Sequence, residues 1–123
     1  MKLHLSTPAG RNAFTGYGSG YVLVNHQRYE QSLVVTPDRI VTDWTATTFE
    51  ALEVTHFAAL AELGVEIVLL GTGERLRFPR PEIVHPLIAA HIGLEVMDVQ
   101  AACRTYNILL AEDRKVAAAL LLR

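Results

Sequence analysis

Two short segments of the sequence carry the residues best suited to bind a ligand. The first is Gly71-Thr72-Gly73, which ends a run of aliphatic residues. Glycine amides at the end of a buried strand can bind a phosphate, but the same pattern is more often a plain tight turn. No helix follows directly to direct its dipole at an anion, because Pro79 excludes one there, and no Lys-Ser/Thr pair of the P-loop kind is present. The turn is therefore favoured, and the phosphate loop remains the alternative.

The second segment contributes four polar residues, which are Asp98, Arg104, Thr105 and Asn107. Asp98 is a good N-cap for a helix, and the side chain of Arg104 leans back toward the N-terminus of that helix. Gln100, Arg104 and Asn107 are spaced by four and then three residues, which predicts one shared polar face. Together with Gly71-Thr72-Gly73, these groups could hold a carboxylate, a phosphate or a protein carbonyl group. A salt bridge from Arg104 to Asp98 or Glu95 would satisfy its charge equally well, so a structural role remains open.

The sequence predicts no catalytic or metal site. Cys103 is the single cysteine and lies on the apolar face of its helix, which favours a buried structural thiol over a nucleophile. His85 and His91 are six residues apart, whereas metal ligands on one helix stack at three or four. No nucleophile lies beside a base in the sequence. We therefore expect no catalytic residue, no metal and no cofactor.

The elements that must position these residues fall into two groups. The front third is expected to form an antiparallel meander with strands over 21–24, 29–36 and 40–44. Alternating helices and strands follow: a helix capped by Thr55 that ends at Gly64, a strand over 65–70, a helix from Pro81 to near Gly93, a strand over 94–97, a helix from Asp98 to about Leu110, and a strand over 115–122. The alanines in the last segment also favour a helix. We interpret it as a strand because a polar link separates it from the preceding helix.

This order predicts one α/β domain over residues 1–123, built as three layers. A central mixed and mostly parallel sheet would lie between helices, with the N-terminal antiparallel meander beside it. In open α/β sheets, ligands bind beyond the carboxyl ends of the parallel strands. Here those ends are Asp43-Trp44, Gly71-Thr72-Gly73 and Met97-Asp98. The two polar segments should therefore meet at one edge of the sheet and form a single candidate pocket.

The bulk composition excludes several classes of protein. The chain has 123 residues and a formal net charge of −2, without the basic stripe that a nucleic-acid surface would need. Its apolar runs are shorter than the ~18–20 residues of a membrane-spanning helix. The N-terminal residues also lack the apolar stretch of a signal peptide. We therefore expect no nucleic-acid partner, no membrane span and a cytoplasmic location.

Two strings of the sequence together carry a resemblance to a known family. LLGTG, followed later by GLEVMDVQAACRTYNILLAEDRKVAAALLL, resembles the small MTH-like family of α/β domains of unknown function. Its members include archaeal and bacterial single-domain proteins and the mitochondrial complex I assembly factor 3. The front end, with GYGSGYVLV and SLVVTPDRIVTDW, is similar as well, so the resemblance covers nearly the whole chain.

The resemblance implies a three-layer fold with a mixed central sheet and a shared surface pocket, but no reaction. The family's recurrent polar residues match Gly71-Thr72-Gly73, Asp98, Arg104, Thr105 and Asn107 here. Val99 is a departure, because the family usually has Thr after Met-Asp. The leading hypothesis is a noncatalytic binding or assembly module that holds a protein segment, such as part of a respiratory or membrane-associated complex. The competing hypothesis is a small-molecule enzyme or sensor that binds an anionic metabolite in the same pocket.

Overall fold

A central sheet of five strands positions the candidate site. In the computed structural model, which describes residues 10–123, the strand order is β5-β4-β8-β6-β7. The strands are β4 (Leu33–Val35), β5 (Ile40–Val41), β6 (Ile67–Gly71), β7 (Gly93–Met97) and β8 (Val116–Leu120). β6 pairs in parallel with β7 and β8, whereas β4 pairs antiparallel with both β8 and β5. The sheet is mixed, as expected, but its four pairings are evenly divided rather than mostly parallel, because the β4–β5 hairpin joins it.

The antiparallel meander exists and contains the expected strand over 21–24, but its other two strands differ from those expected. It consists of β1 (Phe14–Gly18), β2 (Tyr21–Val24) and β3 (Gln27–Tyr29), which form a separate three-stranded sheet. The expected strand over 29–36 is in fact two segments, one ending β3 and one forming β4. β1 was missed because its glycines weaken the strand pattern. Most of the N-terminal stretch through Asn12, which has little pattern of its own, lies outside the described residues.

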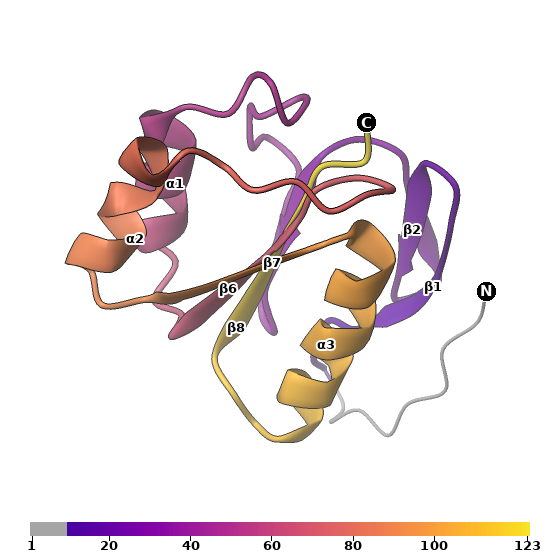
Figure 1. The fold of residues 1–123 in the computed structure, drawn as a ribbon. Coiled ribbons are helices and arrows are strands. Elements are labelled where there is room, and N and C mark those ends of the chain that lie inside the picture. The colour runs from indigo at the N-terminus through magenta and orange to yellow at the C-terminus, as the bar shows by residue number, and fades with distance from the viewer. Residues whose placement is uncertain (1–9) are drawn as a thin grey trace.

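Helices cover both faces of the central sheet (Figure 1). The helical elements are α1 (Val54–Ala61), the 3-10 helix η1 (Pro81–Val84), α2 (His85–Ala89) and α3 (Val99–Ala111). α1 and α2 lie on one side, and α3 lies on the other, near β1 and β2. The N-cap of α1 is Glu53 rather than Thr55, and its backbone N–H donates to His56 Nδ1 at 2.9 Å. α3 begins as expected, because the Asp98 carboxylate accepts a hydrogen bond from the Ala101 N–H at 2.8 Å.

Each face of the central sheet has its own hydrophobic core, and β8 contributes to both. Val116, Ala118 and Leu120 pack into the core with α3 and β1, whereas Ala117 and Ala119 pack into the core with α1. All five residues are fully buried. This two-sided burial explains why β8 has no alternation of polar and apolar residues. The interpretation of this alanine-rich segment as a strand is therefore confirmed.

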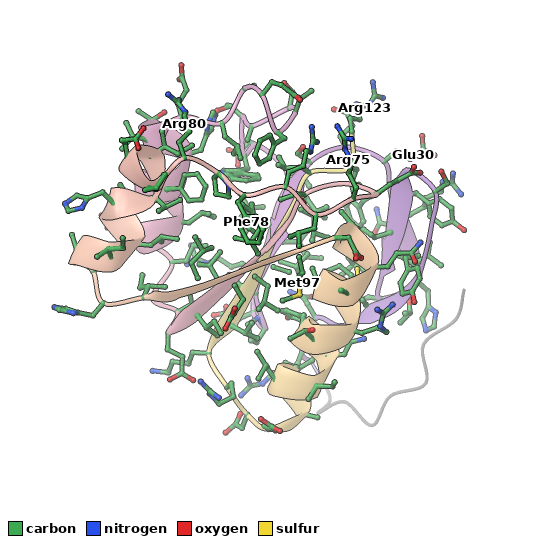
Figure 2. The ribbon with its side chains drawn as sticks, in the orientation of Figure 1. Glu30, Arg75, Phe78, Arg80, Met97 and Arg123 are labelled. Atoms are coloured by element: carbon green, nitrogen blue, oxygen red, sulfur yellow. The ribbon has the colours of Figure 1, made fainter. Side chains whose placement is uncertain are left out.

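The Thr72 side chain holds the loop between β6 and η1 from within. The buried Thr72 hydroxyl donates to the carbonyl of Arg75 at 2.8 Å and accepts from the N–H of Arg77 at 3.0 Å. These bonds hold the loop in an irregular but defined path. It carries Arg75, Phe78 and Arg80 on one side of the molecule (Figure 2).

Candidate functional site

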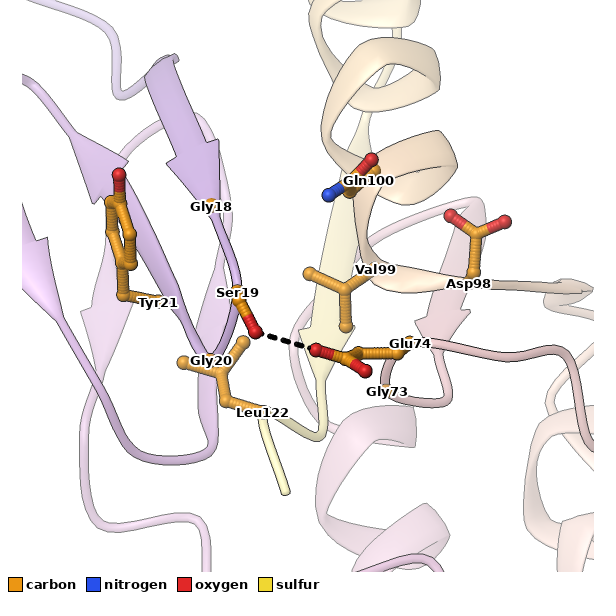
Figure 3. A pocket seen from close by; sticks show the side chains of 10 residues that line it. All are labelled: Gly18, Ser19, Gly20, Tyr21, Gly73, Glu74, Asp98, Val99, Gln100 and Leu122. Atoms are coloured by element: carbon orange, nitrogen blue, oxygen red, sulfur yellow. Dashed lines mark hydrogen bonds between the residues drawn. The ribbon is translucent and has the colours of Figure 1, made fainter. Parts of the chain in front are cut away.

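A pocket opens where three segments of the chain meet at the carboxyl edge of the central sheet (Figure 3). These segments are the β1–β2 turn, the loop after β6 and the start of α3, with one further residue from beyond β8. The cavity has a volume of about 220 Å³. We call it the α3 pocket, and it is lined by Gly18, Ser19, Gly20, Tyr21, Gly73, Glu74, Asp98, Val99, Gln100 and Leu122.

Glycines allow the walls of the α3 pocket to approach one another. Gly73 has φ +86, a left-handed conformation that favours glycine, and it begins the turn after β6, whereas Gly71 is still the last residue of that strand. A Cβ on Gly71 would lie only 2.8 Å from Leu120 Cδ2 and 3.2 Å from Val99 Cα. Gly71 therefore lets α3 pack directly against β6, and this close packing places the start of α3 at the pocket.

The charged side chains of the α3 pocket are both carboxylates. Ser19 Oγ donates a hydrogen bond to Glu74 Oε1 at 2.6 Å, which links the β1–β2 turn to the loop after β6 (Figure 3). Asp98 is the second carboxylate and caps α3. None of the lining residues is Lys, Arg or His. The charge of these walls disfavours an anion and favours hydrogen-bond donors such as amides.

Two of the residues singled out from sequence, Gly73 and Asp98, line the α3 pocket. Gly71 and Thr72 lie beneath it, and both are buried. The Thr72 N–H donates to the carbonyl of Met97 at 2.9 Å, and its hydroxyl is used within the loop. These groups therefore shape the wall rather than face the cavity.

The predicted polar face of α3 is divided between three environments. Asn107 is buried and binds the backbone of β1, accepting from the Phe14 N–H at 3.0 Å and donating to the Phe14 carbonyl at 2.9 Å. Arg104 is exposed, and its Nη1 donates to the Tyr17 hydroxyl at 2.9 Å. Among the described residues Arg104 forms no salt bridge, either with Asp98 or with Glu95. Gln100, the third member of the face, is exposed and lines the α3 pocket. Thr105, which is not part of that face, is half-buried.

Sequence reasoning missed the part of the α3 pocket that comes from the β1–β2 turn. Ser19 belongs to this turn, Tyr21 follows it as the first residue of β2, and Glu74 faces it from the loop after β6. The signal in the sequence is the alternation of Gly16, Gly18 and Gly20, a pattern that favours bends and close strand packing. Gly20, with φ +76, does form the bend. What the alternation did not indicate is that this bend lies opposite the start of α3.

The buried thiol near the α3 pocket is poorly suited to nucleophilic chemistry. Cys103 is fully buried, and desolvation raises its pKa from the ordinary 9.0 to about 12, despite the opposing effect of the neighbouring Arg104 charge. A thiol with so high a pKa is almost entirely protonated at neutral pH. Burial agrees with the structural role expected for this cysteine.

The comparisons with known proteins agree with this fold. The architecture is that of a Mth938-like domain: a solution structure of such a domain from Bordetella pertussis has 36% identity and a TM-score of 0.80, covering 98% of this chain and 92% of that one. A family model described as a protein of unknown function (DUF498/DUF598) matches residues 14–121. The chain belongs to this family, which confirms the resemblance found in the sequence.

Two relatives have names that describe them further. The NADH dehydrogenase [ubiquinone] 1 alpha subcomplex assembly factor 3 of Bos taurus is 30% identical over 107 residues, which are 85% of this chain but 58% of that protein. This chain thus spans little more than half the length of the bovine relative. The "13 kDa major membrane protein" of Francisella tularensis is 27% identical over 105 residues, 85% of each chain. Within residues 10–123, no helix is long and apolar enough to cross a membrane.

Proposed function

We propose that this chain is a noncatalytic binding module that holds a segment of a partner protein in the α3 pocket. The observation that carries this proposal is the preformed cavity itself, whose walls offer hydrogen-bonding groups and contain no cysteine, cationic side chain or histidine. Backbone and side-chain oxygens around Ser19, Glu74 and Asp98 suit the amide donors of an extended peptide. The apolar side chains of Val99 and Leu122 add a surface for one small apolar group.

The remaining residues of the predicted set act as supports in this proposal. Gly73 and Asp98 would contact the bound segment, while Gly71, Thr72 and Asn107 hold the walls in place. Gln100 and Arg104 are both exposed and one helical turn apart on α3. A bound segment that extends along α3 would therefore meet Arg104 next, with Thr105 beside it.

The class of partner follows from the relatives. The bovine relative is named as an assembly factor of a respiratory NADH dehydrogenase, so a respiratory-complex subunit is the partner that we propose. The competing anionic metabolite gains no support from the α3 pocket, because Glu74 and Asp98 would repel it.

The test is affinity purification with mass spectrometry on a pair of tryptophan variants. Gln100→Trp places a large ring at the mouth of the α3 pocket, and Glu112→Trp places the same ring on the exposed far end of α3. Subunits of a respiratory complex should be enriched with the wild type and with Glu112→Trp, and lost with Gln100→Trp. Arg104→Ala should reduce the enrichment.

Equal enrichment with Gln100→Trp and Glu112→Trp would show that the α3 pocket is not the binding site. A thermal-shift screen tests the competing hypothesis on the same proteins. A ligand at one hundred times its dissociation constant adds about 2.7 kcal/mol of stability. If a carboxylate or phosphate metabolite raises the melting temperature of the wild type, and Gln100→Trp abolishes this increase, the ligand of the α3 pocket is a small molecule rather than a protein segment.

A further inference from the structure

A second concave surface lies on the other side of the loop between β6 and η1. Its floor is apolar and consists of Phe49, Leu52 and Ile83, of which Leu52 and Ile83 are buried. The arginines of the loop, Arg75, Arg77 and Arg80, form its sides. The cavity has a volume of about 290 Å³, and we call it the arginine groove.

The charge of the arginine groove is opposite to that of the whole chain. Its lining contains three arginines and one acidic residue, Glu50, which gives a formal charge of +2, whereas the chain carries −2. Glu50 is already paired, because its Oε2 lies 2.7 Å from Arg77 Nη1. The side chains of Arg75 and Arg80 form no salt bridge or hydrogen bond with any described residue. Two cations at the rim are therefore available to an acidic partner.

An exposed aromatic side chain adjoins these cations. Phe78 lines the arginine groove and is 71% exposed, and the nearby Leu76 is 48% exposed. Both belong to the same short loop as Arg75 and Arg80, and Figure 2 shows Phe78 between Arg75 and Arg80 along the course of this loop. Aromatic residues and arginines together are the residues most enriched in protein interfaces.

The arginine groove is held in shape before any partner arrives. Thr72 fixes the loop through its bonds to Arg75 and Arg77. The Arg77 guanidinium lies over the Phe49 ring, with its Cζ 4.5 Å from the ring centroid. Arg77 Nε is buried and has no hydrogen-bond acceptor within the described part of the chain. The backbone of the loop and the Arg77 side of the groove are therefore in place before binding, so that mainly the exposed side chains of Arg75, Phe78 and Arg80 lose conformational entropy when a partner binds.

We propose that the arginine groove docks an acidic peptide segment of a partner protein. The segment would place one apolar side chain on the floor formed by Leu52 and Ile83, with carboxylates on Arg75 and Arg80 and Phe78 packed against its side. A peptide fits better than an anionic membrane, because the apolar floor is recessed and a flat lipid surface cannot reach it. This surface is distinct from the α3 pocket, since the loop places Glu74 on one and Arg75 on the other.

The test measures fluorescence anisotropy of labelled synthetic peptides with the purified chain. The peptides carry one leucine or phenylalanine among aspartates and glutamates, and matched peptides carry asparagine and glutamine instead. We expect the acidic peptides to bind, the amide peptides to bind far more weakly, and added NaCl to weaken the acidic complex. Arg75→Gln combined with Arg80→Gln should weaken binding about tenfold. Phe78→Ser should weaken it as well.

A matched control removes the same charge elsewhere. Arg11→Gln combined with Lys115→Gln changes two exposed cations near the start of β6, the opposite end of that strand, and should leave the affinity nearly unchanged. All these positions are exposed, so thermal unfolding should confirm that each variant folds. Gln100→Trp in the α3 pocket should not affect peptide binding, which separates this proposal from the proposed function.

Three results would overturn the proposal. One is that none of the acidic peptides binds, and another is that the control pair weakens binding as much as Arg75→Gln with Arg80→Gln. The third is binding to phosphatidylglycerol vesicles that needs Arg75 and Arg80 while the acidic peptides fail. That last outcome would make the arginine groove a lipid-binding surface.

Discussion

At the residue scale, the Asn107 side chain pairs with the backbone of a strand much as a neighbouring strand would. Its amide donates to and accepts from the backbone of Phe14, a pairing that joins α3 to β1 across 93 residues of sequence. The neighbouring Tyr106 hydroxyl donates to the Asn12 carbonyl at 2.8 Å and extends the same contact. These bonds satisfy backbone groups that would otherwise be buried without partners.

We predict that Asn107→Ala lowers the free energy of unfolding by about 2–4 kcal/mol, because it leaves the buried N–H and carbonyl of Phe14 unpaired. Urea unfolding followed by circular dichroism would measure the change. Gln100→Ala is the control, since this exposed residue lies on the same helix and its loss should cost less than ~0.5 kcal/mol. Equal effects of the two substitutions would show that the Asn107 contact adds nothing to stability.

The buried thiol of Cys103 gives stability a dependence on alkaline pH. Because burial raises its pKa from 9.0 to about 12, the folded chain keeps a proton that the unfolded chain releases above pH 9. Stability should therefore fall as pH rises from about 9 toward 12, by at most ~1.4 kcal/mol per pH unit. Burial raises the pKa of Tyr106 in the same direction, and its contribution begins at higher pH because its ordinary value is 10.0.

The Cys103 contribution can be isolated with Cys103→Ala. Urea unfolding at about pH 8 and about pH 10 should show a smaller loss of stability in this variant than in the wild type, since the variant lacks the thiol proton that only the unfolded wild type releases over this interval. An equal loss in both proteins would assign the alkaline effect to other groups. Slow reaction of the native thiol with a soluble disulfide reagent, and fast reaction in urea, would confirm the burial independently.

At the scale of elements, the contact of α3 with β6 determines where the α3 pocket forms. The contact depends on the missing side chain of Gly71, because a Cβ there would also lie 3.3 Å from Ala102 Cβ. This close approach allows the Val99 N–H to donate a hydrogen bond to the Gly73 carbonyl at 2.9 Å. The start of α3 and the turn that begins at Gly73 are thus joined directly.

We predict that Gly71→Ala destabilises the fold by about 1–3 kcal/mol, because α3 must shift away from β6. Gly93→Ala is a matched control on the neighbouring strand, since a Cβ there would meet nothing nearer than 3.7 Å. Denaturant midpoints at unchanged m-values would compare the two variants. If Gly71→Ala is no more destabilising than Gly93→Ala, the close approach of α3 is not what requires glycine.

The sequence predicts most elements after residue 53 well and their arrangement less well. The exception is the single helix expected from Pro81 to near Gly93, which is the 3-10 helix η1 followed by the short α2. The periodicity of α3 and the N-cap at Asp98 are local properties, so residue types alone identify them. The hairpin of β4 and β5 belongs to the central sheet because β4 pairs with β8, which is far along the chain. The local residue pattern of β4 and β5 does not indicate this pairing. The same limit applies to the site: the cap at Asp98 was predicted, whereas the contact of Asn107 with Phe14 was not.

At the scale of the whole molecule, the loop after β6 separates two surfaces of opposite charge. The α3 pocket has carboxylates from Glu74 and Asp98, and the arginine groove has free cations from Arg75 and Arg80. A partner with separate basic and acidic segments could contact both surfaces, and the two contacts together would exceed the affinity of either alone. The variants Gln100→Trp and Arg75→Gln with Arg80→Gln test the surfaces separately.

The two hydrophobic cores should unfold together, because β8 packs into both. Trp44, the single tryptophan, is buried in the core with α1, whereas Leu110 is fully buried in the core with α3. We predict that Leu110→Ala costs about 2–5 kcal/mol and shifts the Trp44 fluorescence transition as far as the circular dichroism transition. Leu60→Ala, on the same side of the sheet as Trp44, is the control that should shift both probes in the same way. If Leu110→Ala does not change the midpoint of the Trp44 fluorescence transition, the α1 side of the sheet stays folded when the α3 side unfolds. The shared strand β8 would then not couple the two cores.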